Sequence, residues 1–395
     1  MIREVDILIA GAGPAGCAAA YDLAQGGKHV ILLDKRSFPR HKACACGLTR
    51  KTLKALRYSV DPVIERVCHE IVLQPTASAS PEPDVRVKTR NPICAMAVRE
   101  RFDDFCLQQT LLSARQGGSV ELRKIDRITA LRESSDAIEL DVATAAGMET
   151  LHASILVGAD GSNGQTRRLL HMDAAKDDGF ALEATVPYAD LPATLPSGAS
   201  PQDLIFDFAP LPGGYGWLFP KADHINIGVG AFAPAAGDSQ TQLKKVTRAL
   251  LLEYALQKLG VSTLAHITGQ QLGMGGHTYI PRGRVLLVGD AAGLVDPLTG
   301  EGIHSAVVSG QAAAAAVLEC DLSDDHHVAA AYARHLSPLQ KTLTFSARAA
   351  RAFYAQPERG FKAMRLPLMR SLILKTYADG LPHTGLLTAL AKLTT

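Results

Sequence analysis

A glycine-rich turn between two apolar runs constrains the fold of this chain more than any other feature. The apolar run Asp6–Ala10 leads into GAGPAG at 11–16, and an alanine-rich segment follows as far as Gly26. A second apolar run, His29–Leu33, comes next and is followed by Asp34. Runs of this kind predict buried strands, and the segment between them predicts a helix. The chain therefore opens with a strand, helix and strand, which is typical of an α/β fold.

The spacing of Gly11, Gly13 and Gly16 is typical of a turn that binds a dinucleotide. Glycines let the backbone approach a pyrophosphate closely, and the start of the helix directs N–H groups at that anion. Asp34 follows about twenty residues later, where a carboxylate can accept a hydrogen bond from a ribose hydroxyl. Because strand, helix and acidic residue accompany the glycines, the motif predicts nucleotide binding.

The composition excludes two other classes of protein. The chain has 395 residues, with 41 Lys or Arg, 39 Asp or Glu and 47% hydrophobic residues. It is long enough for two or three cores, and a net charge of +2 argues against dedicated nucleic-acid binding and against a disordered tail. Seven cysteines without a paired CxxC set predict reduced thiols, with no disulfide framework and no zinc site.

Short alternating segments over 180–230 predict an antiparallel sheet inserted between parts of the nucleotide-binding domain. Three strand-like segments precede Val157, and helices are predicted near 99–116, 241–259 and 302–318. The expected fold class is α/β with an inserted α+β part. The expected units are a discontinuous Rossmann-like domain (1–70, 97–172 and 275–330), a mixed or antiparallel-sheet substrate domain (71–96 and 173–274) and a helical C-terminal region (331–395).

Three further turns follow predicted strands or open a helix. Asp160 lies in GADG and Asp290 in GDAAG, and either alone is a plain strand exit. A carboxylate at Asp290 can hold the hydroxyls of a sugar-like chain, with small residues beside it to leave room. The third turn, Pro297–Ile303, opens a helix whose positive end stabilises negative charge by about 0.3–2 kcal/mol. That charge distribution suits a reduced flavin.

In order and spacing, GAGPAG with Asp34, GADG, GDAAG and PLTGEG resemble the FAD-binding motifs of the group A flavoproteins related to p-hydroxybenzoate hydroxylase. Within that group the chain is most similar to the geranylgeranyl reductase family. The segments that carry this similarity are FPRHKACACGL at 38–48, Arg99-x-x-Phe102-Asp103 and YGWLFPK at 215–221. The resemblance covers most of residues 1–320.

The resemblance implies that one FAD is held by Gly11, Gly13, Pro14, Ala15, Gly16, Asp34, Lys35, Arg99, Asp160, Gly289, Asp290, Pro297, Gly300, Gly302 and Ile303. Tyr215 and Trp217 are then expected to line the substrate cavity, and Cys44 is a candidate proton donor. The chain departs from the family where Ala45 and Cys46 replace the usual glycines, and at His41, where an acidic residue is usual.

Simpler interpretations exist for several of these residues. An aromatic strand such as 215–219 is often plain core, and Cys44 and Cys46 can be inert or a redox-sensitive pair. Lys221 is interpreted as a surface lysine with a buried aliphatic stem. His304 is given no role.

A flavin in this fold can reduce a carbon–carbon double bond, hydroxylate an aromatic ring or generate hypohalite for halogenation. Halogenases of this fold carry Trp-x-Trp-x-Ile-Pro, whereas this chain has Tyr215-x-Trp217-x-Phe219-Pro220. The predicted reaction is hydride transfer from N5 of reduced FAD to an isoprenoid double bond, with a proton from Tyr215, Cys44 or water. Aromatic hydroxylation is the first alternative, followed by halogenation and by a redox-silent FAD module or electron carrier.

The sequence contains no second dinucleotide motif, so NAD(P)H or a reduced ferredoxin is expected as a transient electron donor. The isoprenoid can be a chlorophyll side chain, a quinone tail, an ether lipid or a prenyl diphosphate. No apolar run reaches the roughly 18 residues that span a bilayer, and no signal peptide is evident. The expected location is therefore the cytoplasm.

The C-terminal end is basic, with 10 Lys or Arg and 2 Asp or Glu over 334–395. Phe361, Met364, Leu368 and Leu372 have helical spacing beside basic residues, although Pro367 is expected to kink the helix. One interpretation is peripheral contact with the inner face of an anionic membrane. The other is an ordinary solvated basic face.

Overall fold

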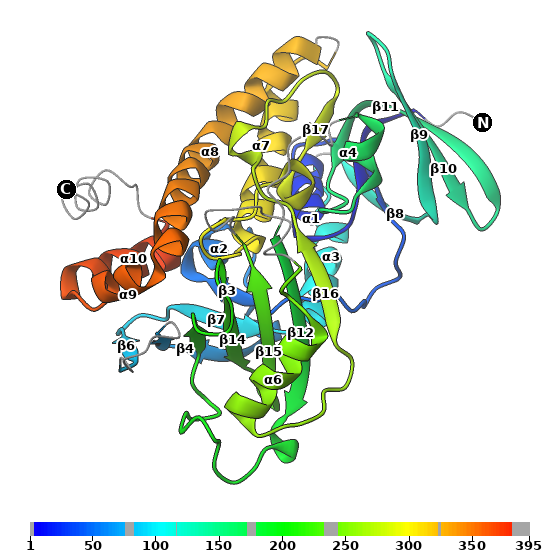
Figure 1. Cartoon of the computed structure of the whole chain (residues 1–395). Helices are drawn as coiled ribbons and strands as arrows, with labels where there is room; N and C mark the ends of the chain where they lie inside the picture. The colour runs from blue at the N-terminus through cyan, green and yellow to red at the C-terminus, as the bar shows by residue number, and fades with distance from the viewer. Residues whose placement is uncertain are drawn as a thin grey trace.

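The computed structural model describes residues 4–75, 83–115, 117–171, 179–232, 244–322 and 325–380. Its strands form three sheets. Figure 1 shows the first sheet with α1, α7 and α8 in the upper part of the view and the second sheet with α6 in the lower part. The predicted fold class, an α/β protein with an inserted sheet domain and a helical C-terminal region, is confirmed.

The first sheet is built on the strand, helix and strand predicted at the start of the chain. Its order is β8-β2-β1-β11-β10-β9, with β17 also paired to β11. Pairing is parallel except where β10 and β9 are added as antiparallel strands. Four strands therefore lie between 117 and 158 where three were expected. The bounds are β1 (Glu4–Ala10), β2 (His29–Asp34), β8 (Ser119–Lys124), β9 (Arg127–Glu133), β10 (Ile138–Thr144), β11 (Gly147–Gly158) and β17 (Val285–Leu287).

Helices bury the parallel part of this sheet, and Ile7, Leu8 and Ile9 of β1 have no exposed surface. The helix α1 packs closely on α7 because both are rich in small residues; a Cβ on Gly310 would lie 2.2 Å from the carbonyl oxygen of Ala15. The bounds are α1 (Pro14–Gln25), α2 (Arg50–Ala55), α3 (Arg99–Leu111), α4 (Gln165–Leu169) and α7 (Ile303–Glu319), with short turns η1 (Asp61–Val63), η3 (Gly276–Thr278) and η4 (Gly289–Ala292).

The second sheet has two faces with different partners. Its order is β16-β12-β15-β14-β13-β5-β6, antiparallel except for the β13–β5 pair. Side chains alternate along β14, so Leu218 packs beneath α6 while Tyr215, Trp217 and Phe219 lie on the opposite face. The bounds are β5 (Glu70–Gln74), β6 (Val85–Lys88), β12 (Gly179–Pro187), η2 (Tyr188–Asp190), β13 (Ile205–Asp207), β14 (Gly214–Pro220), β15 (His224–Ala231), α6 (Arg248–Leu259) and β16 (Thr268–Leu272).

A third, smaller sheet has the order β3-β7-β4. It consists of β3 (Gly47–Thr49), β4 (Ile64–Cys68) and β7 (Cys94–Ala97). Within the range 71–96 expected in the substrate sheet, β5 and β6 lie in that sheet, whereas β7 pairs with β3 and β4. The three-unit division of the chain stays a prediction.

The C-terminal region consists of three helices, α8 (Asp325–Ala355), α9 (Pro357–Met364) and α10 (Pro367–Asp379). Pro367 ends the helical run, as expected, because it occupies the first turn of α10. The expected apolar face is wrong in part: Phe361 and Met364 are buried, whereas Leu368 is 74% exposed. Residues 381–395 lie outside the described residues. None of the described helices is long and apolar enough to span a bilayer.

Candidate functional site

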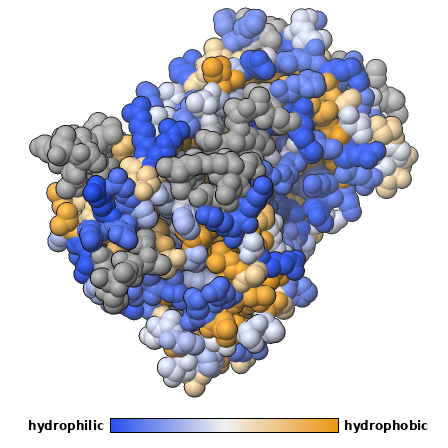
Figure 2. Space-filling view, in the orientation of Figure 1, coloured by the Kyte–Doolittle hydropathy of each residue, from blue (hydrophilic) through white to orange (hydrophobic). Residues whose placement is uncertain are grey.

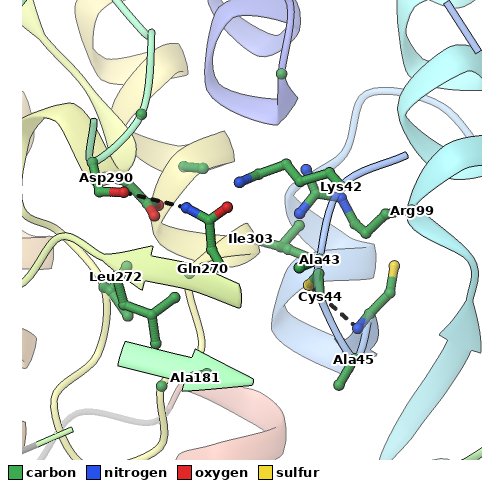
Figure 3. A pocket seen from close by; sticks show the side chains of 18 of the residues that line it. Lys42, Ala43, Cys44, Ala45, Arg99, Ala181, Gln270, Leu272, Asp290 and Ile303 are labelled. Atoms are coloured by element: carbon green, nitrogen blue, oxygen red, sulfur yellow. Dashed lines mark hydrogen bonds between the residues drawn. The ribbon is translucent and has the colours of Figure 1, made fainter. Parts of the chain in front are cut away.

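A cavity of about 520 Å³ lies where the carboxyl ends of β1, β2, β11 and β17 meet the aromatic face of the second sheet. Ligands bind at this edge in open α/β sheets because the turns after the strands and the helix starts converge there. The loop between β2 and β3 forms another wall, as Figure 3 shows for Lys42 to Ala45.

The turn after β1 leaves space for an anion at the start of α1. Gly11 has φ +106°, and a Cβ there would lie 2.4 Å from the carbonyl oxygen of Ala159. No side chain caps α1, and a Cβ on Gly13 would take up cavity space with only Arg40 nearby. Gly16 does not line the cavity; a Cβ there would lie 1.9 Å from the Gly11 carbonyl oxygen, so the missing side chain lets the start of α1 lie close against the turn.

Asp34 connects the end of β2 to this turn. Its Oδ2 accepts a hydrogen bond from the Ala12 N–H at 2.9 Å, and its Oδ1 accepts from the Arg36 N–H at 2.8 Å. Each carboxylate oxygen has further acceptor capacity. Asp34 can therefore hold the turn and still accept from a ribose hydroxyl, with Lys35 beside it in the wall.

Charged side chains meet in the middle of the cavity. Figure 3 shows Lys42 extended from its loop toward the side on which Asp290 lies. Arg99 is held by two 2.8 Å hydrogen bonds to Asp103. Burial raises the pKa of Asp290, while the Lys42 and Arg99 cations oppose that change. Burial also lowers the pKa of Lys42, and the Arg99 cation lowers it further.

Hydrogen bonds from backbone N–H groups to the Asp296 carboxylate fix the turn before α7. Asp296 accepts hydrogen bonds from the N–H groups of Leu298 and Thr299 at 2.9 and 3.0 Å. Gly300 has φ +68°, and α7 begins after Gly302 without a side-chain cap. The positive end of α7 therefore faces the cavity, which Gly300, Gly302 and Ile303 line.

Of three further residues expected to bind the cofactor, Asp160 lines the cavity and also holds the start of α4, whereas Gly289 and Pro297 do not line the cavity. Asp160 lines the cavity, but its Oδ2 accepts from both Thr166 N–H and Thr166 Oγ1, at 2.8 and 2.9 Å. Gly289 donates its N–H to Ser309 Oγ at 2.9 Å, and neither it nor Pro297 lines the cavity. A strand-end motif in the sequence cannot distinguish these uses.

The far half of the cavity is aromatic. Trp217 donates its Nε1–H to Asn226 Oδ1 at 2.7 Å, and its ring covers Gly228, where a Cβ would lie 2.0 Å from the ring. The Tyr215 hydroxyl donates to the Thr299 carbonyl oxygen, and burial raises the pKa of Tyr215. Other aromatic residues that line this half are Phe206, Phe219, Phe232 and Tyr377.

The Cys44 loop is fixed by buried polar groups. Cys46 has φ +48°, and its N–H donates to Cys44 Sγ at 3.3 Å; both cysteines are free thiols. Lys221 was expected at the surface, and this was wrong: it is 2% exposed. Its Nζ donates to the Ala45 carbonyl oxygen at 2.6 Å, because β14 ends directly beneath the loop. Burial lowers the pKa of Lys221.

Most predicted residues meet at one cavity. Those that line it are Gly11, Gly13, Pro14, Ala15, Asp34, Lys35, Cys44, Arg99, Asp160, Tyr215, Trp217, Asp290, Gly300, Gly302 and Ile303. Sequence reasoning missed Lys42, Glu183, Phe206, Gln270 and Tyr377, which also line it. Glu183 alone had a local signal, as the single charge in an otherwise uncharged strand. The others come from separate segments without a motif.

The residues present fit FAD. The glycine turn and the uncapped start of α1 suit a pyrophosphate, Asp34 suits a ribose, and the start of α7 suits the negative charge of a reduced flavin ring. The buried carboxyl of Asp290 and the cations of Lys42 and Arg99 lie between these two ends. Fold and cavity together define an FAD-dependent oxidoreductase.

Comparisons with known proteins support the assignment as an FAD-dependent oxidoreductase. Residues 4–320 match the family described as FAD binding domain, and the chain belongs to this family. A relative from Methanosarcina barkeri, named only as an uncharacterized protein, is 31% identical over 79% of this chain and 74% of its own. Menaquinone reductase of Mycolicibacterium smegmatis is 29% identical over 80% of this chain and 76% of its own. Digeranylgeranylglycerophospholipid reductase 3 of Methanosphaera stadtmanae is 27% identical over 82% of this chain and 81% of its own.

Solved structures share the fold. A geranylgeranyl bacteriochlorophyll reductase-like protein of Thermoplasma acidophilum superposes with a TM-score of 0.78 at 18% identity, covering 96% of this chain and 98% of its own. The flavin-dependent brominase Bmp2 has a TM-score of 0.71 at 16% identity, covering 95% and 94%. At such identities the likeness concerns the fold alone. The homology of this chain to geranylgeranyl reductases rests on the sequence relatives.

Proposed function

We propose that this protein reduces carbon–carbon double bonds of an isoprenoid group. The observation that carries the proposal is the aromatic half of the cavity, formed by Tyr215, Trp217 and Phe206, which continues directly from the half that fits FAD. A long apolar chain is stabilised by such a wall through burial of its surface. Relatives named as reductases of geranylgeranyl groups and of menaquinone support the same substrate class.

Reduced FAD, when bound, supplies the hydride in this chemistry. The chain itself must exclude water, hold the substrate and provide one proton. Trp217, fixed by Asn226 on one side and by Gly228 beneath it, gives the wall a rigid position. Because the Tyr215 hydroxyl hydrogen is directed at Thr299, this tyrosine serves to hold the turn before α7 against the wall.

The electron donor is proposed to be NAD(P)H or a reduced ferredoxin that binds transiently, since the sequence carries one dinucleotide motif. The corner between α9 and α10 is proposed to touch an anionic membrane that holds the substrate. Leu366 and Leu368 are 47% and 74% exposed there, beside exposed Lys362 and Arg365. Apolar side chains flanked by cations suit an anionic interface.

An anaerobic experiment tests the proposed function. The purified yellow protein is reduced with dithionite, and prenyl compounds are added one at a time while the flavin absorbance is followed. Reoxidation without oxygen, together with a saturated product, supports the reductase. Reoxidation only on admission of air, with a hydroxylated aromatic product, indicates a monooxygenase instead.

A further inference from the structure

The strand β12 carries one acidic residue, Glu183, and places it on the cavity face of the second sheet. Its neighbours Leu182 and Ala184 pack on the other face, beneath α6. Glu183 is 7% exposed. A carboxyl group at such a position is costly to bury unless hydrogen bonds or an opposite charge compensate for the lost water.

Hydrogen bonds fix this carboxyl group between the Cys44 loop and Trp217. Its Oε1 accepts from the Cys44 N–H at 2.7 Å. The Asn226 side chain, which accepts from Trp217 Nε1–H at 2.7 Å, also hydrogen-bonds to it. In the sheet, Glu183 pairs in register with Gly228, the residue that the Trp217 ring covers. The carboxyl group therefore lies at the edge of the aromatic wall.

Among the residues that the structure describes, none forms an ion pair with Glu183. Lys221 and Arg99 act on it only through longer-range attraction, and the Cys44 N–H and the Asn226 amide favour its anion. Burial outweighs these effects and raises the pKa of the Glu183 carboxyl. The neutral acid is thereby favoured over a wider pH range than in water.

The other candidate donors make contacts of their own, and for Tyr215 the contact uses the donor hydrogen. The Tyr215 hydroxyl hydrogen is directed at the Thr299 carbonyl oxygen, on the side of α7. The Cys44 sulfur accepts a hydrogen bond from the Cys46 N–H in its own loop. Glu183 is a carboxyl group in the cavity wall that accepts hydrogen bonds from the Cys44 N–H and from the Asn226 amide. Each carboxyl oxygen has two lone pairs, so an oxygen that accepts one of these hydrogen bonds can also carry a proton.

Resting on the proposed reductase function, we propose that Glu183 donates the proton that completes reduction of the substrate double bond. One alkene carbon gains a hydride, with its two electrons, from the reduced flavin. The π electrons of the alkene form a C–H bond at the other carbon with the proton of the Glu183 O–H group. The flavin is oxidised, the alkene is reduced, and the carboxylate left behind takes a proton from solvent.

The variant Glu183→Gln tests this role, because the amide oxygen can still accept from the Cys44 N–H but the side chain is no longer an acid. In anaerobic single-turnover measurements we expect flavin reoxidation by a prenyl substrate to slow by about 100-fold or more. In the wild type the rate should fall as the pH rises through the Glu183 pKa, because the acid form is lost. This dependence should vanish in the variant. Asp190→Asn, an exposed matched change just beyond β12, should leave rate and profile unchanged.

A second measurement does not depend on turnover. Infrared difference spectra across a pH titration should show the C=O band of a protonated carboxylic acid that is absent from Glu183→Gln. Absence of that band in the wild type at the assay pH would overturn the proposal, as would a variant with the wild-type rate and pH profile. If no prenyl compound reoxidises the wild-type flavin, the proposed function fails first, and the donor role fails with it.

Discussion

The hydroxyl group of Tyr215 donates a hydrogen bond to the carbonyl oxygen of Thr299, which connects the second sheet to the turn that opens α7. Two segments 84 residues apart in sequence thereby hold each other in place at the centre of the cavity. The sequence motif predicted that Tyr215 lines the substrate cavity, and this contact gives it a positioning role as well.

Tyr215→Phe should therefore retain FAD, lose stability and turn over more slowly, with an unchanged pH profile. The Thr299 carbonyl oxygen loses its partner, which costs about 1–3 kcal/mol of unfolding free energy. Chemical denaturation and steady-state rates measure both effects. Tyr254→Phe, beneath the opposite face of the same sheet, is the control for turnover. A pH dependence that disappears in Tyr215→Phe would instead identify the tyrosine as the proton donor.

Gly228→Ala should displace the Trp217 ring, since the new Cβ would lie 2.0 Å from it. We expect FAD to stay bound, a stability loss of about 1–3 kcal/mol from overpacking, and slower reoxidation by a prenyl substrate. The double variant Trp217→Ala/Gly228→Ala is the control. It should behave like Trp217→Ala alone, because the ring that collides is gone. Additive losses would show that Gly228 acts through another contact.

Asp34→Asn should weaken FAD retention. The amide keeps one acceptor oxygen, so it cannot satisfy both the Ala12 and the Arg36 N–H groups and a ribose hydroxyl. Loss of a hydrogen bond to a charged group, about 1.5–3 kcal/mol, corresponds to roughly 10- to 150-fold in Kd. Titration of apoprotein with FAD, followed by flavin fluorescence, measures this. The exposed change Asp136→Asn should have no effect, and equal affinities for both variants would exclude Asp34 from the site.

His304 should make the protein less stable in acid. Burial, with the Lys51 cation nearby, lowers the pKa of His304 from 6.5 to about 3. The unfolded chain therefore binds a proton below about pH 6.5 that the native protein does not, so stability present at neutral pH is lost as the pH falls toward 3. At pH 5 the loss is about 2 kcal/mol. His304→Gln should flatten the melting temperature between pH 7 and 5, whereas the exposed His69→Gln should not.

Membrane contact at the corner between α9 and α10 should depend on both apolar and charged residues. Wild-type protein should sediment with anionic liposomes at low salt and be released as salt screens the charges. Replacing exposed Leu368 by Ser should weaken this binding, because its apolar surface no longer enters the interface. Leu112→Ser, which changes an 80% exposed leucine just after the end of α3, is the control. No sedimentation at low salt would leave the corner as an ordinary solvated surface.

Local rules predicted the opening strand, helix and strand of the first sheet and many of the residues that line the cofactor half of the cavity, because their signals lie within short segments. The turn at 11–16, Asp34 and the turn at 297–303 each combine a backbone requirement with a strand or helix boundary. Prediction failed where a side chain's surroundings come from distant segments. Lys221 was expected at the surface, yet the Cys44 loop covers it.

The same distinction between local signals and long-range contacts explains why the cofactor half of the site could be predicted and the position of Glu183 could not. By itself, the amino-acid sequence determined that a glycine turn precedes a helix and that an acidic residue ends the next strand, since these depend on neighbouring residues. Only the tertiary structure decided that Glu183 lies between the Cys44 loop and Trp217, because that juxtaposition depends on strand register and on which face of the second sheet is turned to the cofactor domain. Hydrogen bonds and burial between residues far apart in the chain set the chemistry of such groups, and no local pattern records them.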